Sequence, residues 1–283
     1  MKAYLELTKP GVTWLILMST AVGYYFGAAG EWHWPRLLHT LLGTGLLASG
    51  TAVLNEWYEW ELDGRMLRTR RRPIPSGRVD PPRALAFGIV LSALGFAELA
   101  LAVNPLAASW GLLTLICYLF LYTPLKRLTP HATTVGALPG AMPPLIGYAA
   151  ARGALTAEAW ALFAILFLWQ FPHFLAIAWM HREDYRRAGT VFLPVVEPDG
   201  RSTARRMFVG SLLLIPASLC PVWLSMAGWL YGMGALALGL GFLLVTLRVA
   251  MARTDLRARG VFVASVIYLP LLYGLMLLDG FRV

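Results

Sequence analysis

Long apolar runs, separated by short polar segments, dominate the chain. A helix that crosses a bilayer needs about 20 mostly apolar residues. Nine runs approach or exceed that length, and they cover residues 12–29, 36–55, 83–103, 105–122, 132–151, 157–180, 206–226, 228–250 and 261–279. The pattern therefore predicts an all-α integral membrane protein with nine transmembrane helices. An odd number of spans would place the two termini on opposite sides of the membrane.

The composition excludes an ordinary soluble domain. Hydrophobic residues make up 58% of the 283 residues and charged residues 14%, against about 45–50% and about 25% in soluble domains. The mean hydropathy of +0.62 agrees. The net charge is nevertheless +9, which indicates a membrane protein with basic cytoplasmic loops, a membrane-bound protein that binds anions, or both. The two cysteines, Cys117 and Cys220, lie in apolar runs and form no metal-binding or disulfide pattern.

The positive charges are distributed unevenly between the two ends of the predicted spans. Of the 24 lysines and arginines, 21 fall on the side of the N-terminus, and only Arg36, Arg152 and Arg282 fall on the other side. Cytoplasmic loops of membrane proteins carry an excess of Lys and Arg. This asymmetry predicts that the N-terminus and the long loops are cytoplasmic.

The two long cytoplasmic loops follow the second and sixth runs and resemble one another. Each contains an acidic cluster, then arginines, then a proline-bearing stretch, over residues 56–75 and 183–194. This weak repeat, offset by four helices, divides one domain, 1–283, into halves of about 1–130 and 131–283. The fifth run contains three glycines and three prolines between Gly136 and Gly147. Such a broken helix either lines a cavity or simply bends against its neighbours, and the sequence favours neither.

Three oxygen-bearing side chains recur at every fourth position where the second run ends. Asn55, Glu59 and Asp63 share one face of a helix, because eight residues return to within about 40° of the starting direction. Carboxylate and amide oxygens suit Mg²⁺, which also binds phosphate oxygens and water. The alternative is an ordinary charged helix end. The metal-binding interpretation is favoured by the regular spacing and by the arginines that follow, which suit phosphate: Arg68, Arg70, Arg71 and Arg72.

Two further polar clusters are predicted on the same cytoplasmic face. Glu183 and Asp184 follow the sixth run and offer a second acidic edge, and Lys126 and Arg127 follow the fourth run. Each alone is equally typical of a solvated loop. Together they predict a site for an amphipathic diphosphate, with its head at the membrane surface and its tail between helices. Mg²⁺ and basic side chains would stabilise departing diphosphate, and an aromatic, dry cavity would protect a carbocation from water.

One histidine lies at membrane depth. His173 is inside the sixth run, where polar groups are functional candidates, so it is a candidate haem-binding residue, as an iron ligand or in positioning the porphyrin. A hydrogen-bonded structural histidine beside Pro172 is the alternative. The other histidines fall near loops or helix ends and are expected to be solvated or interfacial: His33, His39, His131 and His181. Glu98 receives no role.

The segments that carry these residues resemble the UbiA-type intramembrane prenyltransferases. AsnGluTrpTyrGluTrpGluLeuAsp (55–63) followed by ArgThrArgArgArgProIlePro (68–75) resembles the first motif of that superfamily. A narrower resemblance, to the protohaem IX farnesyltransferases or haem O synthases, extends in order along essentially the whole chain. It rests on residues 7–10, 122–130, 136–148, 169–174, 183–189, 192–195 and 265–270.

The resemblance implies a bundle of nine helices around a central cavity. It also implies farnesyl transfer from farnesyl diphosphate to a vinyl group of haem B, with water completing haem O, for cytochrome oxidase haem biosynthesis. The implied cofactor is Mg²⁺, and the implied location is the cell (inner) membrane, as a multi-pass protein. Implied partners are the two substrates and the lipid bilayer, then haem A synthase or oxidase assembly factors, with no nucleic acid.

The same resemblance assigns roles to the candidate residues. Asn55, Glu59, Asp63 and Asp184 would be catalytic and hold metal, together with Glu183. Arg68, Arg72, Lys126 and Arg127 would bind the diphosphate. Position 59 is usually Asp in the family, and residue 188 is Ala where the wider superfamily has a second acid, so the choice between Glu183 and Asp184 as metal contact stays open. Two alternatives remain: a related transferase acting on a quinone precursor or chlorin, and a transporter of an anionic lipid.

Overall fold

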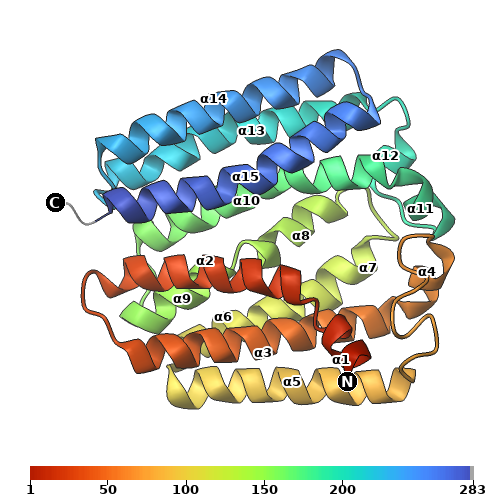
Figure 1. Cartoon of the computed structure of the whole chain (residues 1–283), viewed down its shortest axis with the longest axis horizontal. Coiled ribbons are helices and arrows are strands. Elements are labelled where there is room, and N and C mark those ends of the chain that lie inside the picture. Colours follow the sequence, from red (N-terminus) through yellow and green to blue (C-terminus); the bar gives the residue numbers. More distant parts are fainter. Residues whose placement is uncertain (281–283) are drawn as a thin grey trace.

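Residues 1–280 of the chain are described by the computed structural model, and every regular element within them is a helix or a turn (Figure 1). Arg282, one of the three basic residues predicted on the non-cytoplasmic side, lies outside the described residues. Among residues 1–280, eight helices are long and apolar enough to cross a membrane. They are α2 (Pro10–Ala28), α3 (Trp34–Tyr58), α5 (Pro81–Ala102), α6 (Pro105–Ile116) continued by η1 (Cys117–Tyr122) and α7 (Thr123–Leu125), α10 (Ala157–Met180), α13 (Arg201–Trp223), α14 (Trp229–Met251) and α15 (Asp255–Asp279).

The prediction of an all-α, multi-pass membrane protein is confirmed. The fifth apolar run differs from the rest, because it forms two short helices, α8 (Ala132–Gly140) and α9 (Pro143–Arg152), separated at residues 141–142. Pro143 and Pro144 occupy the first turn of α9, where a missing N–H costs no hydrogen bond. The count of nine spans and the orientation of the N-terminus stay predictions.

Two helices begin earlier than their apolar runs. α13 starts at Arg201 rather than at residue 206, and α15 starts at Asp255 rather than at residue 261. The hydroxyl of Thr254 accepts the backbone N–H of Arg257 and so caps α15. Hydropathy does not detect such polar first turns.

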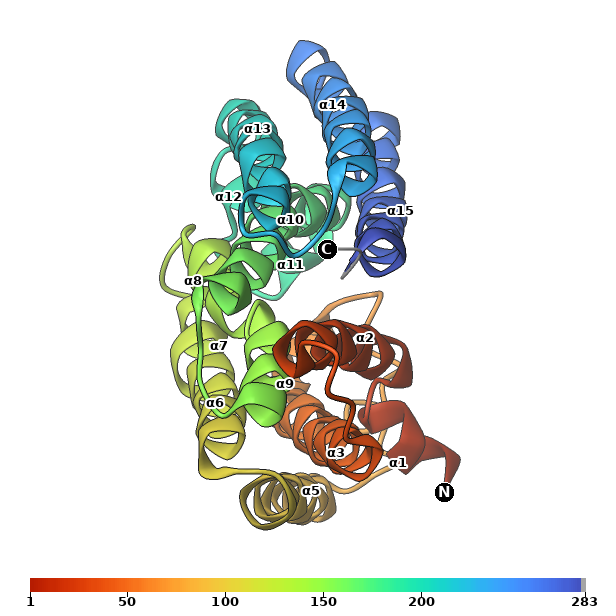
Figure 2. The ribbon, with the colours of Figure 1, turned by 90° about the vertical axis from the view of Figure 1, so that its left-hand side faces the viewer.

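The helices form two groups, seen end-on in Figure 2. One group contains α2, α3, α5, α6 and α9, and the other contains α10, α13, α14 and α15, with α8 between them against α10 and η1. The apolar core of α10, α13, α14 and α15 also includes residues of α2 and α9, such as Val22 and Tyr148, and Trp110 and Leu155 touch both this core and the core of the first group. Because α9 packs on α2, the first group includes residues beyond position 130.

The α2–α9 contact depends on glycine. A Cβ at Gly147 would lie 1.9 Å from the carbonyl oxygen of Thr20, and one at Gly23 would lie 2.0 Å from that of Pro144. The backbones therefore approach one another at distances that any side chain would prevent. This contact holds the second half of the broken segment against the first transmembrane helix.

Short helices and loops gather at one end of the bundle, on the right of Figure 1. They include α4 (Trp60–Arg65), α11 (Arg182–Arg187) and α12 (Leu193–Val196). Most of the candidate site residues lie at this end.

Candidate functional site

Asn55, Glu59 and Asp63 keep their predicted spacing although the helix bends between them. α3 ends at Tyr58 and α4 begins at Trp60, with Glu59 as the junction. The backbone N–H of Glu59 still donates to the Asn55 carbonyl at 3.0 Å, and that of Asp63 donates to the Glu59 carbonyl at 2.9 Å. The four-residue repeat therefore survives the bend. Asn55 and Asp63 are buried, and Glu59 is partly exposed.

The first cluster of the site consists of Asn55, Glu59, Thr123 and Lys126, and Glu59 lies at its centre. Its Oε2 atom accepts hydrogen bonds from Lys126 Nζ at 2.7 Å and from Asn55 Nδ2 at 2.9 Å. Asn55 Nδ2 also donates to the hydroxyl of Thr123 at 3.3 Å, and Lys126 lies over the ring of Tyr122. Burial alone would lower the pKa of Lys126, but the Glu59 carboxylate reverses this effect, so the pKa of Lys126 is raised above its ordinary value.

The helix that carries these partners contains a π-helical turn. Residues Cys117–Tyr122 form η1, immediately before Thr123 and Lys126. The hydroxyl of Thr123 donates to the carbonyl of Tyr118, five residues earlier, at 2.8 Å. Such turns are frequent at functional sites. Here the turn directs Tyr118, Tyr122 and Thr123 toward the site.

The second cluster consists of Lys9, Glu56, Asp63 and Arg72. Arg72 Nη1 donates to Asp63 Oδ2 at 2.6 Å, and Arg72 Nε lies 3.7 Å from Glu56 Oε1. Lys9 Nζ lies 3.4 Å from the same Glu56 oxygen. Burial alone would lower the pKa of Arg72, but Asp63 and Glu56 raise it. Each acid in the two clusters thus faces a cation of the kind that binds phosphate.

Lys9, Glu56 and Thr123 are site residues that sequence reasoning missed. Lys9 lies in the motif LeuThrLysPro, and its backbone adopts a left-handed conformation, φ 48°, which is uncommon outside glycine. Burial lowers the pKa of Lys9 to about 8. Glu56 follows Asn55 directly, about 100° away around the helix, so the search for a single face excluded it. The carboxylate oxygen Oε2 of Glu56 is buried and has no hydrogen-bond partner among the described residues.

The second acidic pair divides into one buried and one exposed residue. Asp184 accepts the backbone N–H groups of Leu67 at 3.2 Å and Arg68 at 3.1 Å, and it also accepts from Arg187. Burial would raise the pKa of Asp184, but these donors lower it overall. Glu183 is exposed and pairs with Arg186 on its own helix. Asp184 therefore fixes the loop that follows α4 to α11, and Glu183 faces outward.

Two of the predicted cations are exposed. The side chains of Arg68 and Arg127 reach solvent, and neither forms an ion pair within residues 1–280. The structure thus brings Asn55, Glu59, Asp63, Arg72 and Lys126 together and joins Asp184 to them through the loop backbone. It leaves Glu183, Arg68 and Arg127 at the surface.

The oxygen donors fit Mg²⁺ only in combination with a phosphate ligand. Among residues 1–280, no three His, Cys, Asp or Glu side chains gather closely enough to hold a metal ion by themselves. Mg²⁺ is usually bound by one or two carboxylates, with substrate phosphates and water completing its shell. Glu59, Asp63 and the amide oxygen of Asn55 are donors of that kind, and the unpartnered Glu56 oxygen lies beside them.

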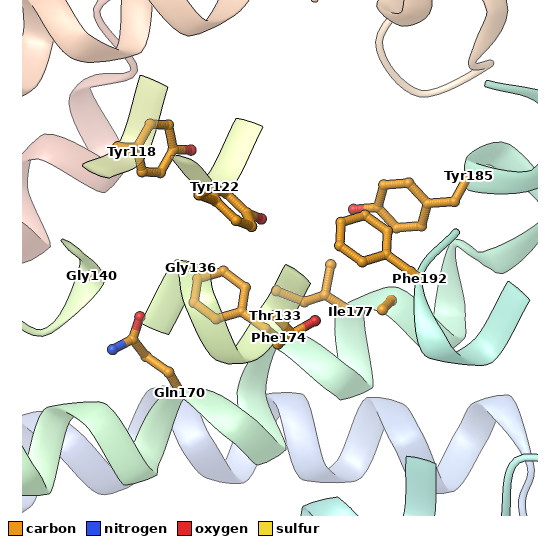
Figure 3. Close-up of a pocket in the computed structure, with 11 residues that line it drawn as sticks. Tyr118, Tyr122, Thr133, Gly136, Gly140, Gln170, Phe174, Ile177, Tyr185 and Phe192 are labelled. Atoms are coloured by element: carbon orange, nitrogen blue, oxygen red, sulfur yellow. The ribbon is translucent and has the colours of Figure 1, made fainter. Parts of the chain in front are cut away.

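An apolar pocket opens next to the first cluster. Figure 3 shows Tyr118 and Tyr122 on one side of it and Tyr185 and Phe192 on the other. The remaining lining residues come from α8 and α10: Thr133, Gly136, Gly140, Gln170, Phe174, Ile177 and Ala178. A Cβ at Gly140 would lie 2.0 Å from the Gln170 amide oxygen, so the glycine creates room for that side chain. Of the two interpretations of the broken segment, the cavity-lining one is supported.

His173 has a defined partner on α15. The hydroxyl of Ser265 donates to the carbonyl of Phe262 at 2.6 Å, so its oxygen must accept from His173 Nδ1, 2.8 Å away. Trp169 stacks on the imidazole at 4.6 Å between ring centroids, and Phe262 lies 5.3 Å away in a tilted arrangement. This assignment leaves Nε2 of the neutral ring as a free acceptor. Glu98, which received no role, pairs with His39 at an exposed position.

The position of the acids and cations, at the ends of helices, argues against the transporter alternative. Transporter binding groups usually lie near the bilayer midplane. The acids and cations described above lie instead where α3 and α7 end. A site at this depth suits a ligand with a charged head at the membrane surface.

The sequence is similar to proteins named protoheme IX farnesyltransferase from several bacteria. A protein from Solibacter usitatus named protoheme IX farnesyltransferase is 62% identical over 99% of each chain. A protein of the same name from Koribacter versatilis is 46% identical over 99% of this chain and 93% of its own.

The fold is similar to solved prenyltransferase structures. A structure of digeranylgeranylglyceryl phosphate synthase aligns with a TM-score of 0.83 at 18% identity, covering 100% of this chain and 99% of its own. A UbiA homologue from Archaeoglobus fulgidus, bound to DMAPP and Mg²⁺, aligns with a TM-score of 0.68 at 19% identity, covering 96% and 98%. At such identities the likeness concerns the fold. The sequence itself matches the UbiA prenyltransferase family over residues 16–270, so the resemblance predicted from the motifs is confirmed: the chain belongs to the UbiA prenyltransferase family.

Proposed function

We propose that the protein transfers farnesyl from farnesyl diphosphate to a vinyl group of haem B, giving haem O and diphosphate, with Mg²⁺ as cofactor. The observation that carries the proposal is the pairing of each acid in the two clusters with a cation, directly beside an apolar aromatic pocket. The relatives named protoheme IX farnesyltransferase support the choice of substrates. We place the protein in the cell (inner) membrane, with this site on the cytoplasmic face.

When substrate binds, the ion pairs in both clusters would break, and the cations and acids would bind the diphosphate and Mg²⁺ instead. Lys126 and Arg72 neutralise Glu59 and Asp63 in the absence of ligand. A diphosphate would attract both cations, and the released acids, with Asn55, would hold Mg²⁺. Lys9, directly before α2, would add a third cation, because it lies against the same Glu56 carboxylate as Arg72. Glu183, Arg68 and Arg127 would approach the ligand only from the surface.

The reaction breaks one carbon–oxygen bond and makes one carbon–carbon bond and one new carbon–oxygen bond. The allylic C–O bond of farnesyl diphosphate breaks, and diphosphate keeps the electron pair. The terminal vinyl carbon of haem B bonds to the farnesyl carbon, and water adds its oxygen to the other vinyl carbon and loses a proton. Bound Mg²⁺ supplies positive charge that stabilises the departing diphosphate. Lys126, Arg72 and Lys9 add to that stabilisation in a partly buried site, where charges interact more strongly than in water.

The apolar pocket would bind the start of the prenyl chain. Tyr118, Tyr122, Phe174 and Phe192 line it with aromatic rings, and the prenyl chain would displace water from it. Exclusion of water matters here because water would otherwise capture the allylic cation before the vinyl group does.

His173 would bind or position haem. Its Nδ1–H is fixed by Ser265, which leaves Nε2 as the atom able to contact iron. Ligating histidines usually donate their other ring N–H to such an acceptor. Replacing His173 with Ala should change the absorption spectrum of bound haem, and an unchanged spectrum would return His173 to a structural role.

The function is tested by incubating the purified protein with haem B, farnesyl diphosphate and Mg²⁺. The expected product is heavier than haem B by one farnesyl group plus hydroxyl, as measured by mass spectrometry. Omission of Mg²⁺ should abolish it. Recovery of unmodified haem, together with prenylation of a quinone precursor in a parallel reaction, would overturn the choice of acceptor but not the prenyltransferase assignment.

A further inference from the structure

A second cavity lies at the opposite end of the bundle. It has a volume of about 460 Å³ and is lined by polar and aromatic residues around the α2–α3 turn and the end of α9. Arg36 on α3 is 19 residues before Asn55. At 1.5 Å per residue, the two lie roughly 28 Å apart along the helix axis. That separation is close to the thickness of the hydrocarbon core of a bilayer, about 30 Å, so the cavity is at the other membrane surface from the acid–cation clusters.

Two arginines share this cavity. Arg36 and Arg152 both line it, and among residues 1–280 they are the lysines and arginines found at this end of the bundle. Neither guanidinium forms an ion pair or a hydrogen bond with another described residue. Glu158 lies near enough to sense the charge of Arg152 but forms no ion pair with it. Two guanidinium groups that line one cavity without an ion-paired carboxylate are suited to bind an oxyanion.

Aromatic residues place the cavity at the depth of lipid headgroups. Trp32, in the lining, stacks on Trp34 with 5.2 Å between ring centroids, and both indoles are partly exposed. Tryptophan is enriched where lipid headgroups meet the acyl region. The hydroxyl of Tyr24 donates to the carbonyl of His33 and fixes the turn that forms one wall. Glu31 is the one acid in the lining, so the two arginines outnumber it.

We propose that this cavity binds the phosphate of an anionic lipid headgroup through Arg36 and Arg152. The phosphate would sit between the two guanidinium groups, with Trp32 and Trp34 against the acyl region. The proposal concerns lipid binding at the membrane surface opposite the diphosphate site, and it does not depend on the identity of the prenyl acceptor.

The test uses the full-length protein, purified in mild detergent and supplied with phosphatidylglycerol or phosphatidylcholine. Native mass spectrometry measures how much of each lipid stays bound. The wild-type protein should retain phosphatidylglycerol preferentially. Replacing both Arg36 and Arg152 with Gln should lower that retention by at least about tenfold, because two charge-assisted contacts are lost.

Two variants control for charge and folding. Arg201→Gln removes a charge from an exposed ion pair at the opposite end and should retain the lipid as wild type does. Replacing Arg36 and Arg152 with Lys keeps both charges and should preserve most of the binding. Equal thermal midpoints in lipid-free detergent would show that the Gln variant is folded.

Two results would overturn the proposal. One is unchanged retention of phosphatidylglycerol by the folded Gln variant. The other is equal retention of phosphatidylglycerol and phosphatidylcholine by the wild-type protein, because a site built from two arginines should favour the anionic lipid.

Discussion

Lys126 Nζ lies 2.7 Å from Glu59 Oε2, so the cation that follows α7 and the acid at the α3–α4 junction form one ion pair. Glu59→Asp shortens the side chain by about 1.5 Å and keeps the charge, so we expect farnesyl transfer within about tenfold of wild type. Glu59→Gln removes the charge and should lower kcat by about 100-fold. Equal rates for Asp and Gln variants would show that the charge of residue 59 is not used.

Asp63→Ala should abolish turnover. Asp63 is buried and accepts from Arg72, so its loss removes a proposed metal ligand and leaves Arg72 paired with Glu56 alone. We expect a fall in kcat of at least about 100-fold. Asp80→Ala, an exposed acid paired with Arg83, is the matched control and should be unaffected. Asp63→Asn, nearly isosteric, repeats the test if the Ala variant unfolds; wild-type rates in either variant would remove Asp63 from the site.

The affinity for farnesyl diphosphate should weaken as the pH rises above about 8. The pKa of Lys9 is lowered to about 8 by burial, so Lys9 is cationic below that pH and becomes neutral above it. Loss of one cation near the diphosphate should cost about tenfold in affinity. Lys9→Arg stays charged throughout, and its affinity should not show this fall. Parallel pH profiles for the two proteins would contradict a role for Lys9 in binding.

Gly147→Ala should destabilise the fold. The new methyl group would lie 1.9 Å from the Thr20 carbonyl oxygen, and overpacking of this kind typically costs about 1–3 kcal/mol. Gly274→Ala is the matched control, because it also lies inside a transmembrane helix but has open space around it. It should raise the thermal midpoint, since Ala favours helices over Gly by roughly 1 kcal/mol. A midpoint for Gly147→Ala at or above wild type would contradict the close α2–α9 contact.

The orientation can be tested by thiol labelling in intact cells. Cys117 and Cys220 are first replaced with Ser, and a single cysteine is introduced at Ala154 or at Asp199, both exposed and at opposite ends of the bundle. With the N-terminus cytoplasmic, a membrane-impermeant maleimide should label Ala154→Cys and not Asp199→Cys until the cells are lysed. The reverse pattern would overturn the orientation.

The sequence predicts local features of this protein well. The apolar runs predict the eight long helices, and the glycines and prolines between Gly136 and Gly147 predict that the fifth run is broken. Asn55, Glu59 and Asp63 could be placed on one face because four-residue spacing is a property of a single helix.

Contacts between distant segments could not be predicted in the same way. The pair Glu59–Lys126 joins positions 67 residues apart, and Asp184 reaches the backbone of Leu67 and Arg68 across more than 100 residues. These contacts depend on how helices pack, which periodicity does not encode. The single domain 1–283 with its two repeat halves, and partners such as haem A synthase or oxidase assembly factors, stay predictions.

The π-helical turn at Cys117–Tyr122 makes the site sensitive to chain length as well as to residue type. A π-turn contains one more residue than an α-turn, and one residue corresponds to about 100° of rotation around the helix. Deletion of a single residue here, even the exposed Phe120, would convert the π-turn to an α-turn and move Tyr118 and Tyr122 relative to Thr123 and Lys126. A homologue with one residue fewer in this stretch would therefore have a pocket of different shape beside the same ion pair.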